Sequence, residues 1–162
     1  MPEANPSRMS PDDLETWSAL ATVLEWLPPA LDAQLSREFD LTHFEYGILY
    51  ALAAAPDRTL RLRVLADYAN SSLSRLSRAV SRLESRGWAR RVPDPDDGRS
   101  TLATLTDEGW QIFSRATPGH EATVDRLVLG VLTQAQRRQL RDISHRIMHA
   151  IREDEGWQAG SV

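Results

Sequence analysis

The sequence predicts a mainly α-helical fold that carries one small β-hairpin. Two observations favour this fold. Apolar residues recur every three or four positions along most of the chain, which is the spacing of one helix face. Residues 88–105 break this spacing, because two short segments of strand-like composition flank the turn sequence PDPDDG. We therefore expect several helices with a single hairpin among them.

The first helix is expected within residues 10–40. Ser10, followed by a proline and two acidic residues, has the composition of a helix N-terminus. Pro28 and Pro29 have no amide hydrogen and are expected to kink or restart this helix. Residues 1–9 are polar and contain proline, so they are expected to form a flexible leader.

Two shorter helices follow. Thr42 and Glu45 form a capping-box pattern that opens a helix through about Ala55. The next helix is expected over about residues 62–69. Asn70 comes directly after it, and asparagine tolerates the left-handed backbone that a tight turn needs.

A fourth helix, about residues 72–86, is amphipathic and stops at Gly87. Its apolar residues share one face at helical spacing: Leu73, Leu76, Val80 and Leu83. Its arginines fall on the opposite face: Arg75, Arg78, Arg82 and Arg86. Such a helix is either an ordinary solvated surface helix or one that lies in a DNA major groove. In the groove, arginine pairs with guanine and the helix N-terminus favours phosphate.

The hairpin is expected over residues 88–105, and a helix starts after it at Thr106. Pro118 and Gly119 are expected to interrupt that helix, which resumes through about Gly130.

The last helix opens at a second capping-box pattern, Thr133 to Gln136. An apolar stripe follows and needs an apolar partner: Leu140, Ile143, Ile147 and Ile151. Residues 153–162 are acidic and small, so they are expected to form a frayed tail.

Charge is unevenly distributed along the chain. The 162 residues include 19 basic residues, all of them arginine, and 23 acidic residues, for a net charge of −4. Residues 58–99 hold ten arginines and five acidic residues, whereas residues 1–57 hold two arginines and ten acidic residues. The weakly acidic total therefore conceals a basic segment, suited to phosphate, on an acidic scaffold.

Several function classes are not indicated. The chain has no cysteine, and its longest apolar run is the eight residues 48–55, whereas a membrane span needs about 18. No nucleophile motif, glycine-rich phosphate loop or zinc-protease signature is present. His145 and His149 lie four apart on one helix, but no third metal ligand is indicated. We expect no enzyme activity, no cofactor, no metal and no membrane contact.

The order of the elements is that of a winged helix-turn-helix: a short helix, a tight turn, an arginine-faced helix and a basic hairpin. Arg99 lies just past the hairpin tip, where a wing enters the minor groove. Arg90 and Arg91 lie on the first strand, nearer to the arginine-faced helix. Asp97 either holds Arg99 in place or only forms the turn.

These elements resemble the MarR family of bacterial transcription regulators over roughly residues 12–152. In the helix-turn-helix the matching residues are Leu65-Ala66-Asp67, Arg78, Val80, Arg82-Leu83-Glu84 and Arg86-Gly87. In the wing and the helix after it they are Asp97-Gly98-Arg99 and Leu105-Thr106-Asp107-Glu108-Gly109. Leu41-Thr42 and Leu132-Thr133, each opening a helix, also fit.

The resemblance implies a cytoplasmic homodimer that binds double-stranded DNA at a pseudo-palindromic operator and represses transcription. It implies helices for dimerisation in residues 10–40 and 110–152, and a DNA-binding domain over residues 41–109 whose recognition helix spans about 72–86.

Position by position, the resemblance also implies roles for single residues. The implied base contacts are Ser72, Ser74, Arg75, Ser77 and Arg78. The implied phosphate contacts are Arg82, Arg90 and Arg91. Arg99, with Asp97, is implied to reach the minor groove, whereas Arg86 at the far end of the helix is expected to be structural.

An alternative function is a small-molecule-binding or protein-interaction dimer of the same fold without specific DNA binding. The resemblance implies release by a small aromatic ligand. Four residues either line its pocket or belong to the core: Trp17, Trp26, His43 and Tyr46. The chain departs from the family in Asn70, where glycine is frequent, and in Pro28-Pro29, which is expected to alter the dimer interface.

Overall fold

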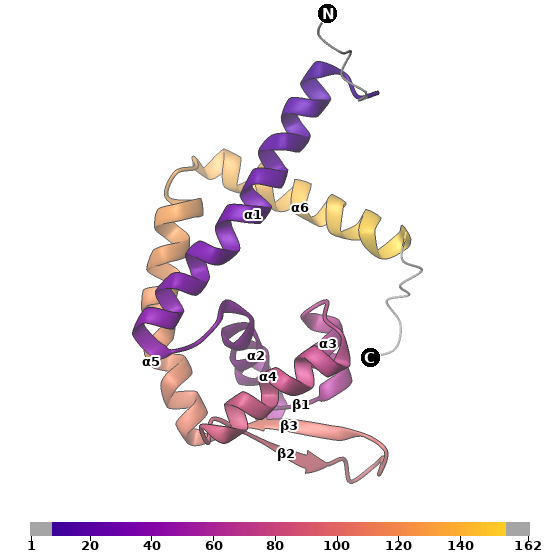
Figure 1. The fold of residues 1–162 in the computed structure, drawn as a ribbon, viewed down its shortest axis with the longest axis vertical. Coiled ribbons are helices and arrows are strands. Elements are labelled where there is room, and N and C mark those ends of the chain that lie inside the picture. Colours follow the sequence, from indigo (N-terminus) through magenta and orange to yellow (C-terminus); the bar gives the residue numbers. More distant parts are fainter. Residues whose placement is uncertain (1–7, 155–162) are drawn as a thin grey trace, which may run out of the picture. The chain divides into compact units, whose positions relative to one another are not determined.

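The computed structural model describes residues 8–154 (Figure 1). The elements run in the order α1 (Pro11–Phe39), α2 (His43–Ala54), η1 (Pro56–Arg58), β1 (Thr59–Arg61), α3 (Leu62–Tyr68), α4 (Leu73–Ser85), β2 (Ala89–Pro93), β3 (Thr101–Leu105), α5 (Asp107–Val124), η2 (Asp125–Leu129) and α6 (Gln134–Asp154). The chain divides after His120 into two compact units. Most of the expected leader and tail lies outside the described residues.

Helix α1 begins as the sequence predicts but is not interrupted. The Ser10 hydroxyl accepts the Asp13 amide at 3.1 Å, and the chain leaves the helix at Asp40 in the left-handed region, with φ 54°. The expected restart at Pro28 and Pro29 is wrong, because the helix runs through both residues. Both prolines are exposed, so water can bind the two carbonyls that lose their amide partners.

The predicted start of the second helix and the predicted turn after the third are confirmed. The Thr42 hydroxyl accepts the Glu45 amide at 3.1 Å, and the Glu45 carboxylate accepts the Thr42 amide at 2.9 Å, which completes the capping box. Helix α3 ends in a turn at Asn70, whose φ of 42° lies in the left-handed region. The turn between α3 and α4 therefore has the conformation that asparagine tolerates.

Helix α4 has the cap and the stop expected of it. The Ser72 hydroxyl accepts the Arg75 amide at 3.3 Å. At the other end Gly87 has φ 73°, its amide bonds the Glu84 carbonyl, and the Trp88 amide bonds the Leu83 carbonyl. This pair of hydrogen bonds is the Schellman arrangement that ends a helix at glycine.

The expected hairpin is part of a three-stranded antiparallel sheet in the order β1-β3-β2. Strands β2 and β3 pair as predicted, with Arg91 opposite Ala103. The sequence did not indicate β1, whose three residues pair with β3 so that Thr59 lies opposite Thr104. A segment this short carries no readable alternation. The mainly helical fold with a small wing is confirmed.

Helix α5 also runs through the expected interruption at Pro118 and Gly119. A side chain at Gly119 would come within 3.0 Å of the side chains of Gln34 and Glu38 on α1. The glycine therefore leaves room for the ends of these two side chains, and the helix is not broken there.

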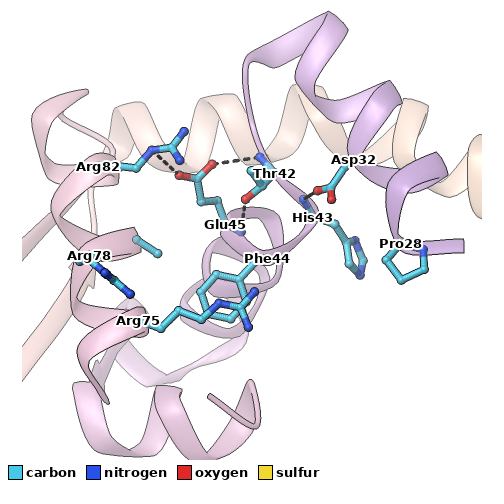
Figure 2. A pocket seen from close by; sticks show the side chains of 10 residues that line it. Pro28, Asp32, Thr42, His43, Phe44, Glu45, Arg75, Arg78 and Arg82 are labelled. Carbon is cyan, nitrogen blue, oxygen red and sulfur yellow. Dashed lines mark hydrogen bonds and ion pairs between the residues drawn. The ribbon is translucent and has the colours of Figure 1, made fainter. Parts of the chain in front are cut away.

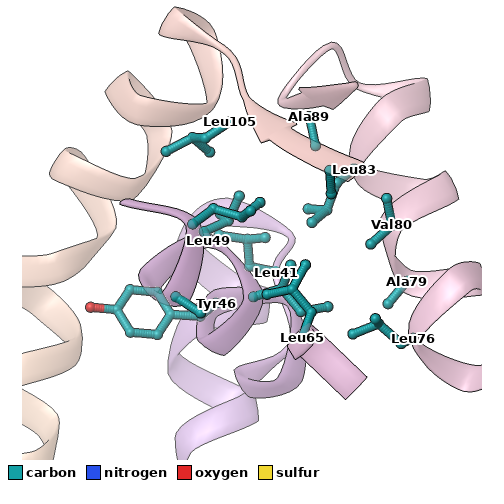
Figure 3. Close-up of a cluster of buried hydrophobic side chains, with 14 of the residues drawn as sticks. Leu41, Tyr46, Leu49, Leu65, Leu76, Ala79, Val80, Leu83, Ala89 and Leu105 are labelled. Atoms are coloured by element: carbon teal, nitrogen blue, oxygen red, sulfur yellow. The ribbon is translucent and has the colours of Figure 1, made fainter. Parts of the chain in front are cut away.

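The core of the first unit forms where α2, α3, α4 and the sheet meet (Figure 3). Its completely or almost completely buried members include Leu35, Leu41, Leu49, Leu65, Leu76, Val80 and Leu83. Leu73 was expected on this buried face, but it is 52% exposed. It is the first residue of α4 and lies at the edge of the packed face.

The second unit is helical in its described part. A π-helical segment, η2, follows α5, and Arg137 donates to the Leu129 carbonyl at its end. Thr133 and Gln136 form the expected capping box, with side-chain hydrogen bonds of 2.9 and 3.3 Å. Within residues 8–154, no helix is both long and apolar enough to cross a membrane.

Gly109 offers a sharp test of the packing in the first unit. A Cβ at this position would overlap the Trp88 carbonyl oxygen and lie 2.7 Å from the Leu105 side chain. We expect Gly109→Ala to lower the free energy of unfolding by about 1–3 kcal/mol, as overpacking does. Urea unfolding followed by circular dichroism measures this change.

Gly47, inside α2, is the matched control, because nothing lies within 4 Å of a Cβ placed there. Gly47→Ala should raise stability by roughly 0.5–1 kcal/mol, since alanine restricts the unfolded chain more than glycine does. Equal effects of the two substitutions would contradict the packing at Gly109.

Candidate nucleic-acid interface

The first two turns of α4 present polar side chains to solvent. Ser72, Ser74, Arg75 and Arg78 are all exposed, whereas Ser77 is half-buried. The Arg75 guanidinium lies over the Phe44 ring at 4.3 Å from its centroid, and a planar cation stacks well on such a ring. Arg78 has no ion-pair or hydrogen-bond partner for its side chain among the described residues. The helix therefore holds one arginine in a fixed orientation and leaves another unengaged.

Two further arginines of α4 are engaged by carboxylates. Arg82 Nε lies 3.1 Å from Glu45 Oε1, and the Glu45 side chain is 3% exposed (Figure 2). Arg86 donates to the carbonyl and the carboxylate of Asp40 and lies over the Trp88 ring at 4.9 Å. Arg86 thus ties the end of α4 to the end of α1, in agreement with its expected structural role.

The wing turn is ordered by two aspartates. Asp94, whose side chain is 4% exposed, accepts the Asp96 amide at 3.0 Å and Arg61 Nε at 2.7 Å. The Asp96 amide, together with the Arg61 guanidinium, holds the pKa of Asp94 below its usual range. Hydrogen bonds from the Ser100 hydroxyl and then the Arg99 amide lower the pKa of Asp97 in the same way. Both carboxylates therefore stay charged at neutral pH.

Asp97 holds the backbone of Arg99 and not its guanidinium. The Asp97 carboxylate accepts the Arg99 amide at 3.1 Å, and no partner for the Arg99 side chain is found within residues 8–154. Of the two alternatives, Asp97 forms the turn, and Arg99 projects from it as an exposed cation.

The two neighbouring arginines of β2 have different surroundings. Arg90 is exposed, and its side chain has no ion-pair partner in the described part of the chain. Arg91 points to α4, where its guanidinium binds Glu84 at 2.8 Å and donates to Ser77 and Ser81. Only Arg90 presents an unengaged charge.

A cavity of about 550 Å³ opens between α4, the second half of α1 and the start of α2 (Figure 2). Its lining includes Pro28, Asp32, His43, Phe44, Arg75 and Arg78. Of the four predicted pocket residues, His43 lines this cavity. Trp17 and Trp26 are exposed on α1, and Tyr46 is buried, with its hydroxyl 3.1 Å from the Thr117 hydroxyl.

Sequence reasoning missed three contributors to this surface. Leu73 is exposed beside the polar first turn of α4. Arg61 and Glu84 hold the wing through Asp94 and Arg91, and a local pattern does not reveal partners so far apart in the sequence. Among the described residues no group of three potential metal ligands comes together, and His149 pairs with Glu153 at 3.2 Å.

Comparisons with known proteins agree with this geometry. A model of the MarR family matches residues 39–100. The transcriptional regulator HosA of Escherichia coli O111:H- is 32% identical over 111 residues, which cover 68% of this chain and 80% of HosA.

Two solved structures from Streptomyces coelicolor share the fold. Sco3205, a MarR family transcriptional regulator crystallised in complex with DNA, has a TM-score of 0.86 and 37% identity, covering 91% of this chain and 92% of its own. The transcriptional regulator PcaV, crystallised with its natural ligand, has a TM-score of 0.66 and 29% identity, covering 88% and 94% of the two chains.

The family model spans the helix-turn-helix, β2 and the wing turn, which carry the exposed arginines. The similarity to HosA and Sco3205 extends beyond these elements. The chain therefore belongs to the MarR family, and it is a transcriptional regulator rather than an enzyme.

Proposed function

We propose that the protein binds double-stranded DNA as a homodimer and represses transcription from a pseudo-palindromic operator in the cytoplasm. The observation that carries this proposal is the pairing of an exposed arginine face on α4 with an unengaged arginine at the wing tip. An arginine on a helix can reach guanine in the major groove, and an arginine on a wing can enter the adjacent minor groove. Sco3205, which shares the fold, was crystallised with DNA.

The proposed base contacts lie at the start of α4: Ser72, Ser74, Arg75, Ser77 and Arg78. Arg99 is the proposed minor-groove residue, with Asp97 as the residue that shapes its turn. Arg90 is exposed and suits a phosphate contact. Arg82 also remains a proposed phosphate contact, because its side chain is 56% exposed although its Nε faces Glu45.

The dimer proposal rests on apolar surface. Within α6, Leu140, Ile143, Ile147 and Ile151 are 39–53% exposed, although they form one stripe. On α1, Trp17, Val23 and Trp26 are 52–75% exposed. A single chain in water rarely exposes so many large apolar residues without a partner. We propose that residues 10–40 and 110–152 supply the interface between two copies.

The first test measures the mass of the protein in solution, the salt dependence of its DNA affinity and the spacing of its half-sites. Sedimentation should give the mass of a dimer, and an operator should be selected from genomic DNA fragments. With four phosphate contacts per dimer, from Arg82 and Arg90 of each copy, affinity should fall about 10²-fold between 50 and 200 mM salt. The two half-sites should lie about one helical turn, 10–10.5 bp, apart.

Inserting about half a helical turn between the half-sites should abolish tight binding, since the two recognition helices then face opposite sides of the duplex. A salt-independent affinity, or failure to select any fragment, would favour the alternative of a dimer that does not read DNA.

A second test separates base contacts from phosphate contacts. Arg75→Ala and Arg78→Ala should each cost about 1–3 kcal/mol on the operator and relax base preference at one position. Arg90→Ala should weaken operator and random DNA alike and, because the dimer loses two phosphate contacts, reduce the salt slope by about 2. Fluorescence anisotropy on both DNAs measures these effects, and equal ratios for all three variants would contradict the assignment.

We further propose that a small aromatic acid regulates the protein from the cavity beside α4. Phe44 and Pro28 offer apolar contact, and Arg75 and Arg78 offer positive charge. The His43 side chain lines the cavity, and an imidazole can form a hydrogen bond with a polar group of a ligand. Because the same arginines face DNA in our proposal, an occupied cavity would compete with the operator. PcaV was crystallised with its natural ligand.

Calorimetric titration with salicylate, benzoate and 4-hydroxybenzoate tests the ligand site. At least one of them should bind and release operator DNA, and His43→Ala should weaken this binding. His149→Ala, which removes a 74%-exposed histidine of α6, is the matched control and should leave it unchanged. No binding by any of the three acids, or equal loss in both variants, would rule out this site for aromatic acids.

A further inference from the structure

Arg91 makes an unusual number of contacts for an arginine on a surface hairpin. Its Nη1 donates to Glu84 Oε2 at 2.8 Å, and its backbone amide donates to Glu84 Oε1 at 2.7 Å. Its Nη2 donates to the Ser77 carbonyl and to the hydroxyls of Ser77 and Ser81, at 3.1 and 3.0 Å for the hydroxyls. We call these four residues, Ser77, Ser81, Glu84 and Arg91, the clasp.

The clasp fixes both the place and the direction of β2 relative to α4. One carboxylate, that of Glu84, binds the backbone and the side chain of Arg91 together. The three partners on α4 are spaced four and three residues apart, so they lie on one face of the helix. The Ser81 hydroxyl also donates to the Ser77 carbonyl at 3.0 Å, which leaves its oxygen to accept from Arg91. A planar guanidinium held at several points has little freedom to turn.

The same contacts leave Arg91 badly placed to bind phosphate. Its side chain is 27% exposed, and turning it outward would break its bonds to Glu84 and to both serines. Arg90, the adjacent residue on the same strand, is exposed and has no such partners. Arg61 holds Asp94 directly after β2, so the strand is anchored at its middle and just past its end, and Arg99 extends from the turn that follows.

We propose that Arg91 and Glu84 are positioning residues that set the angle between recognition helix and wing, so that the base-reading face of α4 and Arg99 engage their two grooves together. This inference rests on the proposed DNA binding. It replaces the phosphate role that the family resemblance implies for Arg91. Rigid placement of the recognition helix and the wing raises DNA affinity because less conformational entropy is lost on binding.

The two roles predict opposite effects of neutralising Glu84. If Arg91 were a phosphate contact, Glu84→Gln would remove a nearby negative charge and leave operator binding unchanged or stronger. If the clasp positions the wing, Glu84→Gln should weaken operator binding about tenfold, as Arg91→Ala should. Arg91→Ala should also leave the salt slope unchanged, whereas the control Arg90→Ala should reduce it by about 2.

A double-mutant cycle with Arg99 tests whether the wing depends on the clasp. Arg99→Ala should weaken binding strongly in the wild-type background and little in the Arg91→Ala background, because a misplaced wing has already lost its minor-groove contact. Arg90→Ala and Arg99→Ala should instead add. Additive losses for Arg91 and Arg99, with a reduced salt slope for Arg91→Ala, would overturn the proposal.

A measurement without DNA separates the clasp from the proposed function. The chain has no cysteine, so Gly98→Cys and Ser85→Cys introduce two unique sites for spin labels on wing and helix. With excess unlabelled protein, the distance distribution within one protomer should be narrow in wild type and broader with Glu84→Gln or Arg91→Ala.

An unchanged distribution would overturn the clasp even if operator binding is found. A wild type that binds no operator would instead remove the proposed function and, with it, the DNA-reading role of the clasp. Thermal melting shows whether Arg91→Ala folds. If it does not, the milder Ser81→Ala is measured by operator affinity and by the spin-label distance distribution.

Discussion

Burial of one face of α4 is the constraint on which the rest of the DNA-reading surface depends. Leu76, Val80 and Leu83 are at most 1% exposed and pack where α4 meets α2, α3 and β2. Burying each side chain stabilises the fold by about 1.5–3 kcal/mol, so together they fix the rotation of the helix about its axis. With that rotation fixed, Arg75 and Arg78 lie on the opposite face of the helix and point to solvent.

The arginines of the basic segment fall into two groups: those that form ion pairs with carboxylates and those that do not. Five of the ten arginines in residues 58–99 form ion pairs: Arg58, Arg61, Arg82, Arg86 and Arg91. Where both partners are exposed, as in the pair of Arg58 with Asp107, an ion pair contributes only about 0–1 kcal/mol, so its main effect is on orientation. Fewer arginines are therefore free to bind phosphate than the charge of the segment suggests. The paired arginines instead help to hold the wing in place.

The parts of the fold that the sequence predicted well are those set by neighbouring residues. Ser72, Asn70 and Gly87 mark the start of α4, the turn before it and its end, because each acts on backbone within a few positions of itself. Predictions failed where a distant element decides the outcome. Strand β1 exists only through its pairing with β3, and α5 continues through Gly119, which lies beside the ends of the Gln34 and Glu38 side chains of α1.

The sequence by itself determined the class of the protein: an amphipathic helix with an arginine face, a tight turn before it, a basic hairpin after it, and the resemblance that these carry. Local hydrogen bonds and helical spacing are sufficient for such features, since both are properties of nearby residues. Only the tertiary structure decided which arginines are unengaged. Arg90 and Arg91 are adjacent and chemically identical, yet one faces solvent and the other binds α4, because successive residues of a strand point to opposite faces and only one face meets the helix.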